Sequence, residues 1–136
     1  TKAQIDEESF KQLIQAKTLK CVWDKGKIST WKNGHIIIED EKMKGFTFDS
    51  IDYEKGTARL IANVSAGDVS AMLTIGGITF MEQTKMGSVM FTTVYTQKSE
   101  SMELRETFYA VHSRHVNAFI AKPISTQLYG KCMIWD

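Results

Sequence analysis

Histidine is the side chain best suited to acid–base chemistry near neutral pH, and His112 and His115 stand close together in this chain. Residues three apart lie on opposite faces of a strand, so these two could chelate one metal ion only on a helix. His35 is distant in sequence and no His-Glu-x-x-His spacing occurs, so we predict no metal site. His112 and Glu106 would share one strand face, which leaves an acid–base pair as one enzymatic hypothesis.

Other catalytic and cofactor motifs are missing from the sequence. No Gly-x-Ser-x-Gly elbow occurs, and Gly76-Gly77 is typical of a tight turn between two strands. No Gly-x-Gly-x-x-Gly precedes a helical segment. We therefore predict no cofactor and favour a protein that is not an enzyme.

The aromatic residues and the seven methionines are more informative, because they lie mostly in strand-like segments. They could fill the core of a small barrel, or they could line a cavity for an apolar ligand. Arg105 and Tyr109 share a strand face, with Arg59 as a candidate neighbour; pointing inward they could bind a carboxylate, and pointing outward they would lie on the surface. The candidate ligand-binding residues are Phe48, Leu60, Leu73, Phe80, Phe91, Tyr95, Arg105, Phe108 and Tyr109.

The elements that would position these residues are mainly strands. An amphipathic stripe of Phe10, Leu13 and Ile14 predicts a short helix over 4–16. Frequent Val, Ile and Thr between Gly- and Asn-containing turns then predict strands near 18–24, 27–31, 35–39, 45–53, 57–64, 69–75, 78–84, 88–96, 103–112 and 127–135. Helical spacing of Val116 and Phe119 before Pro123 predicts a second short helix over 113–121.

Two local signals refine this pattern. Asn33-Gly34 predicts a type I′ hairpin, because both residues tolerate positive φ. In 45–53 the apolar positions change phase, which predicts a bulge near Asp49-Ser50.

Consecutive strands joined by tight turns form an antiparallel meander, and closure removes its two free edges. We therefore predict one all-β domain over 1–136, an up-and-down barrel of about 8–10 strands with a short helix at its start and another before its last strand. The expected core comprises Leu19, Val22, Ile37, Phe48, Leu60, Leu73, Ile78, Phe80, Phe91, Phe108, Val111 and Ile134.

The order of these elements resembles lipocalin-like barrels. The Gly-x-Trp motif of lipocalins is replaced by Cys21-Val22-Trp23-Asp24, and a hairpin stands where fatty-acid-binding proteins have a helical pair. The resemblance therefore extends to the fold alone.

The two cysteines, Cys21 and Cys132, lie near opposite ends of the chain. They could be buried small hydrophobic residues or a disulfide. Closure of the barrel would make 18–24 and 127–135 neighbours, so we predict a Cys21–Cys132 bridge and a secreted or periplasmic location. The chain begins at Thr1, from which we expect that a tag or a secretory signal has been removed.

The 136 residues carry 17 Lys and Arg against 16 Asp and Glu, a net charge of +1. This balance argues against a nucleic-acid partner. A bilayer is spanned by about 20 consecutive apolar residues, and no apolar stretch of the sequence is that long.

We expect a barrel that binds a small apolar ligand. The alternative is a filled barrel that acts as a structural or protein-interaction module, with a patch near Trp23, Trp31 and Trp135 as the candidate surface. The sequence leaves the oligomeric state open.

Overall fold

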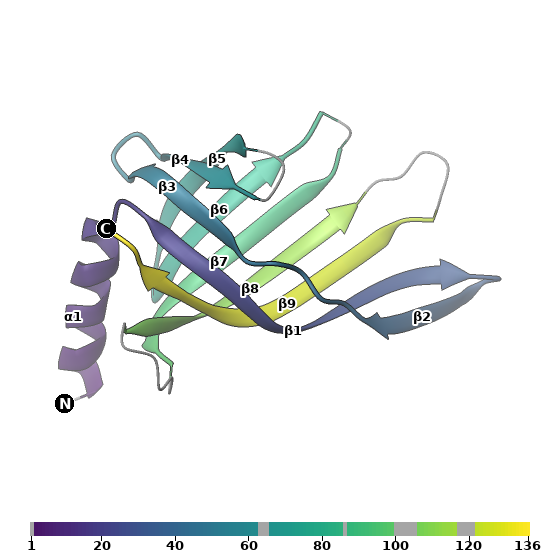
Figure 1. Ribbon diagram of the computed structural model, residues 1–136, viewed down its shortest axis with the longest axis horizontal. Helices are drawn as coiled ribbons and strands as arrows, with labels where there is room; N and C mark the ends of the chain where they lie inside the picture. Colours follow the sequence, from purple (N-terminus) through teal and green to yellow (C-terminus); the bar gives the residue numbers. More distant parts are fainter. Residues whose placement is uncertain (1, 63–65, 86, 100–105, 117–121) are drawn as a thin grey trace.

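The computed structural model describes residues 2–62, 66–85, 87–99, 106–116 and 122–136. These contain a helix, α1 (Lys2–Gln15), followed by strands (Figure 1). The strands are β1 (Leu19–Lys32), β2 (His35–Asp40), β3 (Phe46–Asp52), β4 (Thr57–Ile61), β5 (Ala66–Thr74), β6 (Gly77–Gln83), β7 (Val89–Lys98), β8 (Thr107–Val116) and β9 (Ile124–Ile134).

The sheet closes on itself because β1 pairs with both β3 and β9. The order is β2-β1-β3-β4-β5-β6-β7-β8-β9, and every neighbouring pair is antiparallel. Eight strands therefore form a closed barrel, and β2 is an extra strand that extends from it beside β1 (Figure 1). The predicted up-and-down barrel with a helix at its start is confirmed.

The first strand is continuous where two strands were predicted. Its pairing with β9 shifts register between Trp23 and Lys25, so Asp24 is the extra residue of a bulge. The turn predicted around Asp24 and Gly26 is wrong. The residue types that favour turns also favour bulges, and β9 pairs with β1 on both sides of this bulge, so the strand continues.

The Asn33-Gly34 hairpin and the bulge in the third strand are both confirmed. Asn33 and Gly34 have φ of 52° and 79°, as a type I′ turn requires. Ser50 also has a positive φ of 52°, and the β3–β4 register shifts between Asp49 and Asp52. The shift moves the inward position from an even residue, Phe48, to an odd one, so that both Phe48 and Ile51 are buried.

The predicted helix over 113–121 is wrong in its first part. Residues 113–116 continue β8, where Ser113 pairs with Phe91 of β7 and with Gln127 of β9. Hydrogen bonding to strands on both sides outweighs the local helical spacing of the apolar residues. Residues 117–121 lie outside the described part of the chain.

One end of the barrel is filled and covered by α1. Leu13 and Ala16 of α1 join the buried core, whose largest side chains include Phe48, Phe80 and Phe108. Phe48 and Phe80 stack with their ring centroids 4.0 Å apart. Of the predicted core residues, Leu19, Phe48, Ile78, Phe80 and Phe108 are fully buried; Val22, Ile37, Leu60, Val111 and Ile134 are partly buried; and Leu73 and Phe91 are exposed.

The helix is fixed to the barrel by hydrogen bonds at its C-terminal end. The backbone N–H groups of Lys17 and Thr18 donate to the Asp136 carboxylate at 3.0 Å and 2.8 Å. The Tyr53 hydroxyl donates to the Leu13 carbonyl at 3.1 Å, and burial raises the pKa of this hydroxyl. The last residues of the chain therefore hold the link between α1 and β1.

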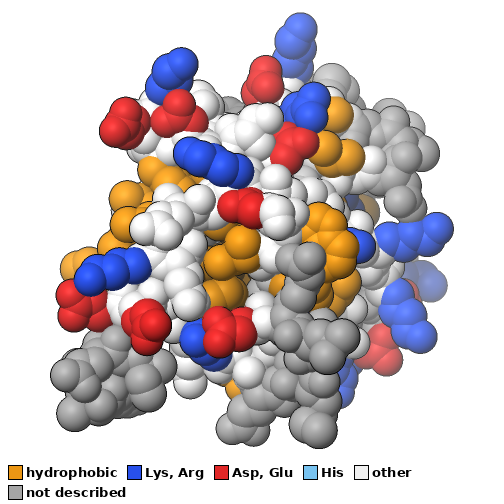
Figure 2. All heavy atoms as spheres, turned by 60° about the vertical axis from the view of Figure 1, so that its left-hand side comes forward, with side chains coloured by type: hydrophobic (Ala, Val, Ile, Leu, Met, Phe, Trp, Pro, Cys, Tyr) orange, Lys and Arg blue, Asp and Glu red, His pale blue; other side chains and the backbone are white. Residues whose placement is uncertain are grey.

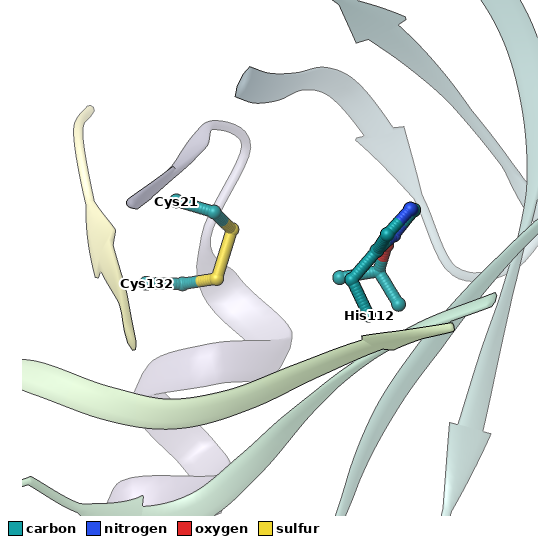
Figure 3. Close-up of a disulfide and its surroundings, with 4 residues drawn as sticks. Cys21, His112 and Cys132 are labelled. Carbon is teal, nitrogen blue, oxygen red and sulfur yellow. A yellow bond between two sulfur atoms is a disulfide. The ribbon is translucent and has the colours of Figure 1, made fainter. Parts of the chain in front are cut away.

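The predicted disulfide is present between Cys21 and Cys132, 111 residues apart in sequence. The two cysteines are direct partners in the β1–β9 register, their Cα atoms are 4.0 Å apart, and both are fully buried. Figure 3 shows the bridge between these two strands. The covalent bond therefore closes the barrel at the first and last strands.

The surface that includes the α1 side of the barrel carries mixed charge. Figure 2 shows acidic and basic side chains interspersed around smaller hydrophobic areas. In the described part of the chain, no helix is long and apolar enough to cross a membrane.

Candidate ligand-binding site

The end of the barrel away from α1 holds a pocket of about 300 Å³, here called the mouth pocket. It is more enclosed than three larger hollows, which lie against α1 and against the β1–β2 hairpin. Its lining is Met43, Phe46, Leu60, Ala62, Ala66, Gly67, Glu82, Met90, His112 and Arg114. Most of these residues are apolar, and three are titratable or charged.

The strand register places the polar residues in two successive layers of the interior. Because side chains alternate along a strand, residues two apart on neighbouring strands form adjacent cross-strand rows. The deeper row consists of Phe80, Thr92, His112 and Leu128, all of them buried. The row nearer the mouth consists of Glu82, Met90, Arg114 and Thr126.

His112 forms part of the boundary between the filled core and the mouth pocket. Its side chain is 1% exposed, and its ring centroid lies 5.1 Å from that of Phe46 and 5.7 Å from that of Trp23. Burial, and secondly the charge of Arg114, lower its pKa to about 4, so the imidazole is neutral at pH 7. Figure 3 shows His112 and the disulfide on the wall of the barrel.

The hydrogen bond between His112 and Thr92 determines which imidazole nitrogen carries the proton. Nδ1 lies 2.8 Å from the Thr92 hydroxyl oxygen. Among the described residues this hydroxyl has no other acceptor, so donating to Nδ1 is the arrangement that leaves fewest polar groups unsatisfied. The proton of the neutral ring then lies on Nε2, which is a donor without a partner in the described part of the chain.

Further buried polar atoms around the pocket share this property. Within the described residues, Arg114 Nε, Trp23 Nε1 and Thr126 Oγ1 also have no hydrogen-bond partner. Trp23 can lie against His112 because its partner on β9 is Gly130, where a Cβ atom would come within 3.0 Å of the indole ring. Buried polar atoms nearly always find a partner, so these atoms are candidates for hydrogen bonds with water or a ligand.

The nine predicted ligand-binding residues fall into four groups. Phe48, Phe80 and Phe108 lie in the packed core, and Leu60 lines the mouth pocket. Arg105 lies outside the described residues. The remaining four are 39–48% exposed and are not brought together with the pocket: Leu73, Phe91, Tyr95 and Tyr109.

The predicted carboxylate-binding neighbour is also placed elsewhere. Arg59 forms two hydrogen bonds to the Asp49 carboxylate, at 2.9 Å and 2.7 Å. The guanidinium holds the pKa of Asp49 below its usual value. Arg59 therefore has a partner of its own at the surface.

Sequence reasoning missed Arg114 and assigned no ligand-binding role to Glu82 or His112, whereas the methionines, which include Met43 and Met90, were considered as lining for a cavity. Alternation along β8 carries the signal, because Phe108, Ala110, His112 and Arg114 share one face of the strand. The predicted strand stopped at residue 112, so Arg114 was assigned to a helix.

The acid–base pair considered for an enzyme is not brought together. Glu106 lies before the first residue of β8, is exposed and forms an ion pair with Lys98 at 3.0 Å. His112 lies six residues further on and faces the interior, about 20 Å along an extended chain. In the described ranges, no three His, Cys, Asp or Glu residues are grouped to hold a metal ion.

Comparison of the chain with protein-family models, with curated proteins and with solved structures gives no match. The class is therefore defined by the fold and the site. The protein is a closed, eight-stranded, up-and-down antiparallel barrel, consistent with a lipocalin-like architecture, with a disulfide at its seam and a pocket at one end.

Proposed function

We propose that the protein binds a small apolar ligand in the mouth pocket. The observation that carries this proposal is a partly enclosed hollow of about 300 Å³ with mainly apolar walls at the open end of a barrel whose other end is filled. Ligand pockets begin at about this volume, and mouths of β-barrels are among their common positions. The ligand is therefore small and lies above the packed core.

The walls suit a ligand without a fixed shape. Met43 and Met90 are flexible and polarizable, whereas Phe46 is held by ring contacts with Phe48 and Trp23. One side of the pocket adapts to the ligand, and the aromatic side is rigid. This combination favours binding of an apolar group over catalysis.

The disulfide supports a secreted or periplasmic location for this binding protein. Bridges of this kind form and persist in oxidising compartments. Cys21 and Cys132 are fully buried, which protects the bond from exchange with external thiols.

Binding of an apolar fluorescent dye, N-phenylnaphthylamine, tests the proposal. Met90→Trp replaces a flexible thioether side chain with a bulky indole ring that fills part of the pocket. The affinity for the dye should fall at least about tenfold. Met72→Trp is the matched control, because Met72 is 43% exposed on β5 and does not line the pocket. Dye binding that is equal in the two variants would contradict the proposal.

A second candidate function, protein interaction, is favoured by the β1–β2 hairpin. In the described residues β2 pairs only with β1, and its Ile36 and Ile38 are 65% and 64% exposed. Antiparallel pairing of β2 with a second copy would place His35 opposite Asp40 and join the free edges. Light scattering should then show a dimer that Ile38→Lys dissociates and Ile75→Lys, in an exposed turn, does not.

A further inference from the structure

The polar atoms beside the mouth pocket are mainly hydrogen-bond donors. Arg114 Nε and Trp23 Nε1 can only donate, and the bond to Thr92 makes His112 Nε2 a donor as well. His112 is 1% exposed, so its ring has little contact with bulk solvent. A buried donor without a partner is costly, and an acceptor atom on a ligand would remove that cost.

Arg114 supplies the charge that selects the kind of acceptor. In the part of the chain that the structure describes, the guanidinium has neither an ion pair nor a hydrogen bond. Arg114 and His112 both line the pocket, and they are neighbours on the same face of β8. The planar guanidinium fits a carboxylate, which accepts two hydrogen bonds side by side.

We propose that the ligand is an apolar monocarboxylate whose carboxylate accepts hydrogen bonds from Arg114 and His112. This inference rests on the proposed function, because it names the class of ligand for the same pocket. The apolar part of the ligand lies against Met43, Leu60 and Met90.

Glu82 is the one acidic residue of the pocket lining, and it must be reconciled with an anionic ligand. It lies in the same cross-strand row as Arg114 but two strands away, which is about 10 Å across the sheet. Its carboxylate lies toward Gly67 of β5. A carboxylate held at Arg114 is therefore much closer to the guanidinium than to Glu82, and the repulsion is the smaller effect.

Calorimetric titration with decanoate and with decanol separates the head group from the chain, because the two probes have the same number of carbon atoms and differ in the head group. At neutral pH the intact protein should bind decanoate at least about tenfold more tightly than decanol. Arg114→Met should remove this preference by lowering decanoate affinity, and decanol binding that persists in this variant shows that it is folded.

Glu82→Gln is the variant of opposite sign in the same row of the barrel, and it should raise decanoate affinity because it removes the one acidic side chain of the pocket lining. Equal binding of decanoate and decanol by the intact protein would overturn the inference and leave the proposed function standing. Failure of both probes to bind would instead overturn the proposed function. If Arg114→Met does not fold, the Glu82→Gln variant decides, and a decanoate affinity that fails to rise in it would overturn the inference.

Discussion

The Thr92 hydroxyl lies 2.8 Å from Nδ1 of His112, on the boundary between the packed core and the mouth pocket. This bond orients the imidazole and leaves its proton on Nε2, where the ring has no partner in the described part of the chain. The same burial that positions His112 for a ligand makes its protonation costly in the folded protein.

The pH dependence of stability should report this buried histidine. The folded pKa of about 4 lies below the unfolded value of 6.5, so the unfolded state binds the proton first as pH falls. His112 therefore has no effect above about pH 6.5 and destabilises the fold progressively down to about pH 4, by about 3 kcal/mol at most. Arg114 and Glu82 are the charged groups of the pocket around it.

Urea unfolding at about pH 7 and about pH 4.5 measures this loss. His112→Gln, which is neutral at both values, should lose less stability over the interval than the wild type. Equal losses would show that His112 is protonated in the folded protein as easily as in the unfolded chain.

The disulfide should contribute about 2–5 kcal/mol to the free energy of unfolding, because it closes a loop of 111 residues in the unfolded chain. Replacing both Cys21 and Cys132 with Ala should lower the urea midpoint accordingly. Thiol titration of unfolded, unreduced protein checks the bond itself and should find no free thiol. Two free thiols would refute the bridge.

Gly130→Ala should destabilise the barrel by about 1–3 kcal/mol. A Cβ atom at this position would lie 2.0 Å from the Val22 carbonyl oxygen and 2.8 Å from the Trp23 Cα, and both are backbone atoms that cannot move independently. Gly67→Ala is the control, since its Cβ would have no neighbour closer than 3.7 Å. Thermal midpoints compare the two; similar midpoints would argue against close approach of β1 and β9 at Gly130.

Asp136→Asn should weaken the attachment of α1 by about 1–2 kcal/mol, because the charged carboxylate accepts the N–H groups of Lys17 and Thr18. Asp24→Asn, an exposed carboxylate on the β1 bulge, is the control. Hydrogen exchange of the Lys17 and Thr18 amides should accelerate in the first variant alone. Unchanged exchange would mean that water replaces the carboxylate without cost.

The strands and their closure could be predicted because alternation and turn residues are local signals that the pairing follows. The side of β7 that points into the barrel could not be predicted in this way. Its large residues Phe91 and Tyr95 point outward, and the smaller Thr92 and Val94 point inward. The physical reason is volume: Phe48, Phe80 and Phe108 already fill the core, so neighbouring positions must be small. Such a choice depends on the whole interior rather than on one strand.

The site was missed for a related reason. Ser113–Val116 carries local helical spacing, and only its pairing with β7 and β9 makes it strand. That pairing turns Arg114 into the barrel beside His112. Long-range hydrogen bonding therefore decided the position of the charge that we assign to ligand binding.

The most direct measurement of the central claim is methyl NMR of protein labelled at methionine, titrated with decanoate. Met43 and Met90 line the mouth pocket, Met72 is exposed on the outside and Met133 is buried in β9. The account predicts that the Met43 and Met90 methyl signals shift together and saturate, while the Met72 and Met133 signals stay in place. Saturating shifts at Met72 alone, or no shift at Met43 and Met90, would contradict binding in the mouth pocket.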